Sequence, residues 1–415
     1  MSASKRMGSV LLTLLFVLCS FYQPAQGSKN GPEDIYKQAW KLVRDNYYDS
    51  SFGGQNWNAW EHKYDGQLKS EEEAFKAIRV MLESLKDPYT RFLDPRAFQD
   101  ENDAIDARIV GIGINLQENK DKTHLVVIKT IEDSPAALAG VQGGDEIQAI
   151  DGASALGLTP EQAAEKIRGK AGTAVNLTVR HKNESKDSTF KIVRAEIIIK
   201  AVRAKRLENN IGYIELSTFI SNDASREFRE ALAQLSNTDG LIIDLRDNPG
   251  GLLSNALEIA DMLLIDGPIV TTIGRGPMPK HVDMASGAPL THQPIVVLVD
   301  EDSASASEIL AGALKDHNRA IVVGNRTYGK GLVQEINRLN SSKAAVHITV
   351  SKYLTPNGTD INKVGINPDV LVTGKNEQLA AAVSTMKQKI ASLRNNRQPG
   401  ASVQGLQTSS LMLSK

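Results

Sequence analysis

Cysteine is nearly absent from this chain of 415 residues, since Cys19 is the only one. It lies in an apolar run near the N-terminus, which we expect to be removed from the mature protein. A mature chain without a thiol has no disulfide bonds, no cysteine nucleophile and no cysteine-bound metal. These three kinds of chemistry are therefore excluded.

Neither sign of charge is in excess, because the chain has 48 basic and 49 acidic residues. Such a balance gives no basic face, which argues against nucleic acid as a partner. The chain is 41% hydrophobic and long enough to bury a large core. We expect two or three domains.

Long hydrophobic runs are absent as well, and the apolar stretch from Val10 to Cys19 is too short for a comfortable membrane span. Lys5 and Arg6 precede it, and the small-residue signal Ala25-Gln26-Gly27 follows. This order predicts a secretory signal peptide over residues 1–27. The large Leu18 before Cys19 favours plain secretion over a lipid anchor. We expect export to the periplasm, or alternatively to a thylakoid lumen.

Composition and periodicity divide the remaining chain into four regions. Residues 28–107 have helical patterns, with a capping box of Ser70 and Glu73, and predict a small helical bundle without a catalytic constellation. Residues 108–194 contain short strands and two short helices, and residues 195–375 alternate strands with helices. Residues 376–415 predict a helix followed by a disordered tail. The whole chain is thus expected to be a multidomain α+β protein.

The second region opens with the segment VGIGINL, in which glycines alternate with apolar residues. Two glycines let successive backbone N–H groups converge on an anion, and the following strand edge can accept an extended peptide. This segment, with the helices and strands after it, resembles a PDZ domain of the type found in bacterial secreted proteases. The resemblance implies a small β-barrel with two helices, and a C-terminal carboxylate held at Gly111, Ile112, Gly113 and Ile114.

Arg168, at the end of the last PDZ helix, has two interpretations. It can simply interact with the helix C-terminus, which we favour. Alternatively, it acts as a sensor that reaches toward the protease body and reports whether the PDZ domain is occupied.

The third region holds the stretch around which we expect the chain to be organised. Ile295–Val299 is a continuous apolar run typical of a strand buried on both faces, and a helical pattern follows it. Ser303, Ser305 and Ser307 therefore lie at a strand-to-helix turn. Farther along, Lys330 stands between two glycines on a loop after another buried strand. A serine–lysine pair could form here.

Four segments carry a closer resemblance: DNPGG at 247–251, SASASEILAGAL at 303–314, YGKGLVQ at 328–334 and PNGTDINKVGINPDV at 356–370. They resemble the carboxyl-terminal processing peptidases, the tail-specific serine proteases of family S41. The short architecture looks more like the cyanobacterial and plastid branch. This implies an α/β layered core with a partly parallel sheet, protein substrates with exposed apolar C-termini, and neither metal nor other cofactor. It leaves open a regulatory or adaptor protein and a homo-oligomeric state.

The resemblance also assigns roles to residues: Ser305 is the nucleophile, Lys330 the general base and Gln334 the residue that orients the lysine. A lysine can serve as a base only if burial lowers its pKa by several units from about 10.4. The oxyanion would be bound by the backbone N–H of Ala306 and of Gly251 or Gly250. We expect the PDZ domain to capture the substrate C-terminus, and its movement to align the lysine loop.

Two alternative sites fit the sequence less well. GNRTYGK at 324–330 matches a phosphate-binding loop as far as its lysine, but Gly331 stands where a Ser or Thr must bind magnesium. A Ser-His-Asp site would need His317 or His347. His317 lies about 18 Å from Ser305 along the predicted helix, which is out of reach. His347 is not excluded, but we expect it to be an ordinary strand residue.

An inactive PDZ adaptor or scaffold is the alternative from another functional class. A serine-rich helix start is usually only a cap, and a Gly-Lys-Gly triplet is usually an exposed turn. The joint presence of Ser305, Lys330 and Gln334 favours the enzyme.

Overall fold

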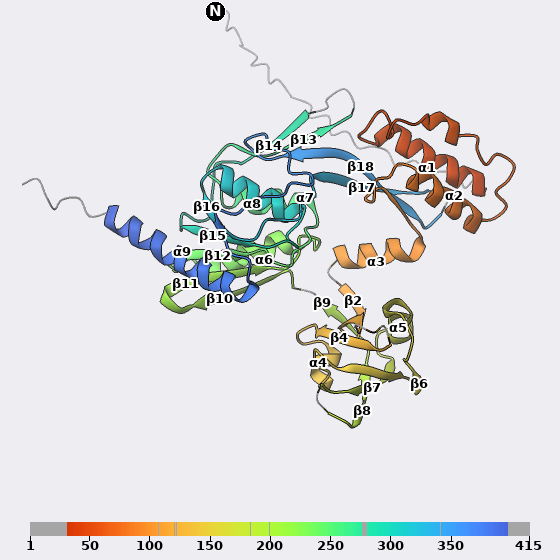
Figure 1. The fold of residues 1–415 in the computed structure, drawn as a ribbon, viewed down its shortest axis with the longest axis horizontal. Helices are drawn as coiled ribbons and strands as arrows, with labels where there is room; N and C mark the ends of the chain where they lie inside the picture. The colour runs from red at the N-terminus through yellow and green to blue at the C-terminus, as the bar shows by residue number, and fades with distance from the viewer. Residues whose placement is uncertain are drawn as a thin grey trace, which may run out of the picture.

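The computed structural model describes residues 31–396, apart from residues 107, 120, 122, 183, 199, 276–279 and 341. The predicted signal peptide and the predicted tail beyond residue 396 lie outside this part of the chain. Within it, none of the helices has the length and apolar character needed to cross a membrane. Figure 1 shows the described chain as N-terminal helices, a separate small β-domain and a larger α/β core.

The core is built on a mixed sheet of six strands in the order β10-β11-β12-β15-β16-β19. Their bounds are Val202–Leu207, Ile211–Leu216, Gly240–Asp244, Ile295–Val299, Ala320–Gly324 and Val370–Leu371. Strands β11 to β19 run parallel, and β10 pairs antiparallel with β11. The predicted layered core with a partly parallel sheet is confirmed.

Helices cover both faces of this sheet, which explains why its central strands are continuous apolar runs. Along β12, Leu241 and Ile243 pack in the cluster that contains the helices of one face. Ile242, which points the other way, packs in the cluster of the C-terminal helix. The first face carries α6 (Ala224–Gln234), α7 (Leu253–Asp261) and α8 (Ala306–Asp316), and the second carries α9 (Lys375–Asn396).

A second sheet joins the N-terminal helices to the core. Its strands are β1 (Arg91–Leu93), β18 (Ala345–Leu354), β13 (Pro268–Gly274) and β14 (Lys280–Met284), and β17 (Leu332–Arg338) also pairs with β18. Helices α1 (Pro32–Asn46) and α2 (Glu71–Glu83), with a short 3-10 helix at Trp57–Trp60, pack on buried residues of the β17–β18 hairpin. The predicted N-terminal helical region is therefore confirmed, but it also contributes β1 to a sheet of the core.

The predicted PDZ domain contains a sheet of β3 to β8 and two helices. Its main strands follow the order β3-β4-β5-β7-β8, so β3 lies at an edge. The strands are Ile114–Glu118, Leu125–Thr130, Glu146–Ile150, Ala174–Arg180 and Asp187–Val193, with β6 (Ala153–Ser154) pairing with β5. The helices are α4 (Pro135–Ala139) and α5 (Pro160–Ile167).

Two connections link the PDZ domain to the rest of the chain (Figure 1). One is a ribbon of β2 (Arg108–Gly111) paired with β9 (Ala195–Ile198). The other is the contact of α5 with helix α3 (Pro95–Ile105), which follows β1 and leads into β2. The limits predicted for the PDZ domain, residues 108 and 194, fall at this ribbon.

Candidate active site

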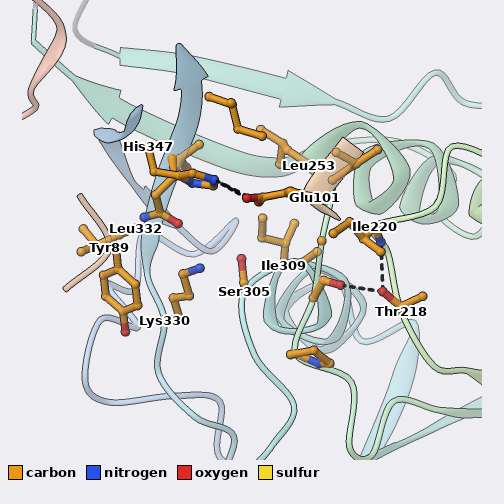
Figure 2. A pocket seen from close by; sticks show the side chains of 18 of the residues that line it. Tyr89, Glu101, Thr218, Ile220, Leu253, Ser305, Ile309, Lys330, Leu332 and His347 are labelled. Atoms are coloured by element: carbon orange, nitrogen blue, oxygen red, sulfur yellow. Dashed lines mark hydrogen bonds and ion pairs between the residues drawn. The ribbon is translucent and has the colours of Figure 1, made fainter. Parts of the chain in front are cut away.

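A cavity of about 480 Å³ lies where the two sheets of the core meet. Its walls come from the start of α8, residues 218–220 and 249–253, the loop before β17 and β17 itself, part of β18, and the segment from Pro88 to Ile105. Ser305, Lys330 and Gln334 all line it. Figure 2 shows the Ser305 hydroxyl and the Lys330 ammonium turned toward the same open space.

Ser305 occupies the tight turn between β15 and α8. Its φ of 56° and ψ of −113° are unusual for a residue with a side chain, and such strain clusters at functional sites. Ser303 and Ser307 are both fully buried, and their hydroxyls donate to the carbonyls of Leu245 (2.7 Å) and Asn248 (2.9 Å). Of the three serines of this turn, Ser305 is the one that lines the cavity.

The turn after β12 lies directly against the Ser305 turn. A Cβ atom at Gly250 would lie 2.6 Å from the carbonyl oxygen of Ala304, so only glycine fits there. The Gly250 N–H donates to Asn248 Oδ1 (2.9 Å). The N–H groups of Gly251 and Ala306 have no acceptor among the described residues, and both residues line the cavity. Gly251 therefore fits an oxyanion-binding role better than Gly250.

Lys330 projects from a loop that packs closely on residues 362–365. Cβ atoms at Gly329 and Gly331 would lie 2.9 Å from the backbone nitrogen of Val364 and 2.7 Å from that of Asn362. Burial, aided by the positive charge of Arg91, lowers the pKa of Lys330 below its usual 10.5. Its ammonium lies 4.9 Å from the ring centroid of Tyr89. The lysine is thus in the kind of environment that a lysine base requires.

Two expected contacts are not formed in this structure. None of the hydrogen bonds of the described residues joins Ser305 Oγ to Lys330 Nζ, although the two groups share the cavity. Gln334 also lines the cavity, but its side-chain Nε2 is buried and has no hydrogen-bond partner among the described residues. In ligand-free sites such contacts are often long and tighten only when substrate binds.

Glu308, on the first turn of α8, joins the serine turn to the lysine loop. It is fully buried, and its Oε2 accepts the N–H groups of Ser305 (2.8 Å) and Lys330 (2.9 Å). Its Oε1 accepts the Gly329 N–H (2.7 Å) and the Thr327 hydroxyl (2.6 Å). One carboxylate therefore fixes both backbone segments. Sequence reasoning missed this residue, although Ser-x-x-Glu at a helix start is a recognisable capping pattern.

Tyr353 on β18 joins the same two segments from the other side. Its hydroxyl lies 3.1 Å from the carbonyl oxygen of Ser305 and 2.5 Å from that of Lys330. Burial raises the pKa of this tyrosine well above 10, so the hydroxyl stays protonated and can donate. Glu308 and Tyr353 thus bind the N–H and C=O groups of the same two residues.

Charged residues from the N-terminal region form one wall of the cavity. Glu101 on α3 pairs with His347 Nε2 on β18 at 2.9 Å, and Arg91 lies 3.4 Å from the Glu101 carboxylate. Burial alone would raise the pKa of Glu101, but the hydrogen bond and charge of His347, with Arg91, lower it. The region in which we predicted no catalytic constellation therefore supplies part of the cavity wall: Pro88, Tyr89, Arg91, Glu101 and Ile105.

Neither histidine considered earlier is placed as a base for Ser305. His347 lines the cavity, but its Nε2 is engaged with Glu101 (Figure 2). His317 is the residue after the last turn of α8, and its Nε2 lies 2.7 Å from the carbonyl oxygen of Pro268.

The predicted carboxylate-binding segment lies at the start of the PDZ edge strand. Gly111 ends β2, Ile114 begins β3, and Gly113 has a positive φ of 79°. Ile112 is buried in the PDZ core, so it can contribute to peptide binding only through its backbone.

Arg168 caps the C-terminus of α5 and pairs with Asp100 on α3 (3.1 Å). Glu165 on α5 also pairs with Arg96 on α3. The side chain of Arg168 thus reaches the helix that leads from the PDZ domain to the cavity.

The chain has an α/β core with a serine at a strand-to-helix turn, and a small β-domain is attached to that core. This is the architecture of PDZ-containing serine proteases. Sequence comparison with protein families agrees. The profile of peptidase family S41 matches residues 210–372, the PDZ profile matches residues 107–180, and the tricorn protease C1 domain matches residues 29–70.

Whole-chain relatives extend this agreement. A carboxyl-terminal-processing protease of Picosynechococcus is 40% identical over 89% of this chain and 90% of its own length. The chloroplastic carboxyl-terminal-processing peptidase 3 of Arabidopsis thaliana is 37% identical over 83% of this chain and 70% of its own. The solved structure of a photosystem II D1 C-terminal processing protease matches with a TM-score of 0.58 and 30% identity, over 83% and 94% of the two chains. The chain belongs to the carboxyl-terminal-processing serine proteases of peptidase family S41.

Proposed function

We propose that this protein is an endopeptidase that cleaves proteins near their C-termini with a Ser305–Lys330 dyad. One observation carries the proposal. The cavity brings together a strained serine, a partly buried lysine of lowered pKa, and the backbone N–H groups of Gly251 and Ala306, for which the described residues offer no acceptor. A nucleophile, a base and an oxyanion-binding pair are the groups that acyl transfer needs.

The chemistry follows from these groups. Neutral Lys330 takes the proton of the Ser305 hydroxyl as the oxygen attacks the scissile carbonyl. The N–H groups of Gly251 and Ala306 stabilise the resulting oxyanion, and the N-terminus of α8 adds favourable potential. The protonated lysine then gives its proton to the leaving amine, and water hydrolyses the acyl-enzyme with the lysine again as base. Gln334, whose Nε2 has no partner in the part of the chain that the structure describes, would orient the lysine through its side-chain amide when substrate closes the site.

The cavity favours an apolar side chain next to the scissile bond. Apolar groups from several elements line it, including Ile220, Leu253, Ile309 and Leu332. We further propose that the segment from Gly111 to Ile114 binds the substrate's C-terminal carboxylate, while the preceding residues pair with the edge strand β3. The position of β3 at the sheet edge supports this mode of binding. The names of the relatives also support substrates processed at their carboxyl termini.

Helix α3 offers a route by which PDZ occupancy could affect the active site. Asp100 pairs with Arg168 of the PDZ domain, and the next residue, Glu101, pairs with His347 in the cavity wall. We therefore propose Arg168 as the residue through which the PDZ domain communicates with the core.

We also propose that residues 1–27 export the chain to the periplasm or to a thylakoid lumen. The basic, apolar and small-residue order supports export. The named chloroplast and cyanobacterial relatives fit either compartment. N-terminal sequencing of the protein recovered from fractionated cells tests this, because a mature N-terminus at residue 28 is expected.

The enzyme proposal is tested with an unstructured protein substrate that ends in apolar residues. Purified wild type should cleave it, whereas Ser305→Ala and Lys330→Ala should both reduce kcat/KM by at least about 10³-fold. A substrate with an amidated C-terminus should be cleaved more slowly, because the PDZ loop then loses its anion. Equal cleavage by all three proteins would rule out the dyad, and cleavage by none of them would favour a binding role.

A further inference from the structure

Asp300, the residue after β15, is a buried carboxylate that organises two turns at once. It is 0% exposed. Its Oδ1 accepts the N–H groups of Asp247 (3.0 Å) and Ser303 (3.1 Å), which begin the turns of Gly251 and Ser305 respectively. Its Oδ2 is also buried and accepts no hydrogen bond among the described residues. A buried carboxylate in this state requires a counter-charge.

Lys375, the first residue of α9, provides that charge. Its Nζ lies 3.3 Å from Asp300 Oδ2, 2.7 Å from Asp247 Oδ1 and 3.8 Å from Asp302 Oδ2. The three carboxylates gather within 4.8 Å of one another and repel; water screens the exposed Asp247 and Asp302, whereas the buried Asp300 is screened least. The hydrogen bond to Asp247, reinforced by Asp300, raises the pKa of Lys375 and keeps it charged. The nearby Arg246 is bound to Asp244 instead.

The two turns that Asp300 joins carry the two halves of the proposed oxyanion site. They are cross-linked through the carbonyl of Asn248, which accepts the Ala304 N–H (3.0 Å) and the Ser307 hydroxyl (2.9 Å). The Gly251 N–H belongs to one turn and the Ala306 N–H to the other. Their convergence on one oxyanion therefore depends on the register between the turns, and oxyanion stabilisation is sensitive to such geometry.

We propose that Lys375 is a positioning residue for catalysis at Ser305. By neutralising Asp300, it holds the turn of residues 247–251 against the turn of residues 300–306 and keeps the N–H groups of Gly251 and Ala306 aimed at one point. The N-terminus of α9, on the far face of the sheet, thereby becomes part of the support of the active site. This inference rests on the proposed function, because it assigns the oxyanion to those two N–H groups.

The kinetic test compares Lys375→Met and Lys375→Arg with Lys387→Met, a change at an exposed lysine of the same helix. For Lys375→Met we expect kcat to fall about 10- to 100-fold and KM to stay within about 2-fold, since the oxyanion forms only in the transition state. A peptide boronic acid, whose tetrahedral adduct occupies the same site, should lose affinity by a similar factor. Lys375→Arg, which keeps the charge, should restore kcat to within about 3-fold of wild type. A Lys375→Met variant with kcat within about 2-fold of Lys387→Met overturns the inference.

A second comparison separates the charge effect from a general loss of stability. In an Asp300→Asn background no buried charge remains to be neutralised, so adding Lys375→Met should lower kcat by less than about 3-fold. If Lys375→Met lowers kcat in the Asp300→Asn background as much as in wild type, the inference is contradicted. If Lys375→Met alone does not fold, this double variant still provides the comparison with Asp300→Asn.

Hydrogen exchange gives a readout that needs no activity. Peptides covering residues 245–252 and 300–307 should exchange faster in Lys375→Met than in Lys387→Met, and unchanged exchange in both turns refutes the positioning role. Failure of the wild type to cleave substrate or to react with a fluorophosphonate refutes the proposed function instead. The two failures are therefore distinguishable.

Discussion

Replacing Glu308 with glutamine should weaken the fold and the catalytic site together. The carboxylate accepts four hydrogen bonds, from Ser305, Lys330, Gly329 and Thr327, at 2.6 to 2.9 Å. A glutamine can turn its oxygen toward Ser305 and Lys330, and its NH₂ can donate to the Thr327 hydroxyl. The Gly329 N–H then loses its acceptor and faces another donor.

The size of the effect follows from this rearrangement. An unsatisfied buried N–H costs about 1–3 kcal/mol, and each of the two bonds that lose their charged acceptor weakens by about 1 kcal/mol. The sum is about 3–5 kcal/mol, which is a large loss but does not exceed a typical stability of about 5–15 kcal/mol. The variant should therefore still fold. Because backbone shifts of about 1 Å at a reacting group can cost 10²-fold in rate, we expect kcat to fall about 100-fold with KM nearly unchanged.

The assay pairs urea denaturation, followed by far-UV circular dichroism, with steady-state cleavage of a peptide substrate. Glu258→Gln, at an exposed position on α7, is the matched control. Hydrogen exchange of the segment 303–330 locates the loss, which should be concentrated in the serine turn and the lysine loop. If Glu308→Gln lies within about 0.5 kcal/mol and about 3-fold in kcat of Glu258→Gln, the bridging role is refuted.

Three further results are expected. Catalysis needs neutral Lys330, whose pKa lies below 10.5, so kcat/KM should rise with pH through that lowered pKa. Because Arg91 helps to lower this pKa, Arg91→Ala should move the rise to higher pH, whereas Arg226→Ala, at an exposed position on α6, should not. A pH–rate profile of Arg91→Ala without this shift contradicts the role of Lys330 as the base. Tyr353→Phe removes the donor to the Ser305 and Lys330 carbonyls, so stability should fall by about 1–3 kcal/mol and kcat by about 10-fold, measured by denaturation and steady-state kinetics. Leu253→Ala enlarges the apolar cavity, so it should favour substrates with a large side chain next to the scissile bond. In a series of peptides, the ratio of kcat/KM for large over small side chains at that position should rise by about 10-fold, and an unchanged ratio would place the specificity pocket elsewhere.

The parts of the site that are local in sequence could be predicted. Ile295–Val299 is buried on both faces, and a run of apolar β-branched residues indicates this directly. The placement of Ser305 at the following turn, and of Lys330 on a glycine-flanked loop, depends on short segments whose periodicity changes from strand to helix or loop. Such signals arise from backbone geometry within a few residues.

The remaining wall of the cavity depends on contacts that leave no local signal. β1 has only three residues, too few for a period to be visible, and it pairs with a strand more than 250 residues later. Glu101 appears as an ordinary charged residue of an amphipathic helix until His347, 246 residues away, is placed beside it. Glu308 carries a capping signal, but the signal concerns only its own helix, whereas three of its four partners, Thr327, Gly329 and Lys330, lie on the lysine loop. Tertiary packing decides all of these roles.

Two of the charged contacts of α3, Asp100–Arg168 and Glu101–His347, differ in exposure, and this difference predicts how salt should affect the enzyme. Asp100 and Arg168 are each almost half exposed, so their pair is screened by salt and contributes at most about 1 kcal/mol. The Glu101–His347 contact, which is an ion pair only when His347 is protonated, is much less exposed, at 20% and 12%, and is screened less. Rising ionic strength should therefore release the PDZ domain from α3 before it disturbs the cavity. We expect salt to reduce the advantage of a substrate with a free C-terminal carboxylate, while cleavage of a short peptide that reaches only the cavity changes little. Arg168→Gln should remove the part of this salt dependence due to the Asp100–Arg168 pair, and an equal response of wild type and variant would show that this contact does not couple the two domains.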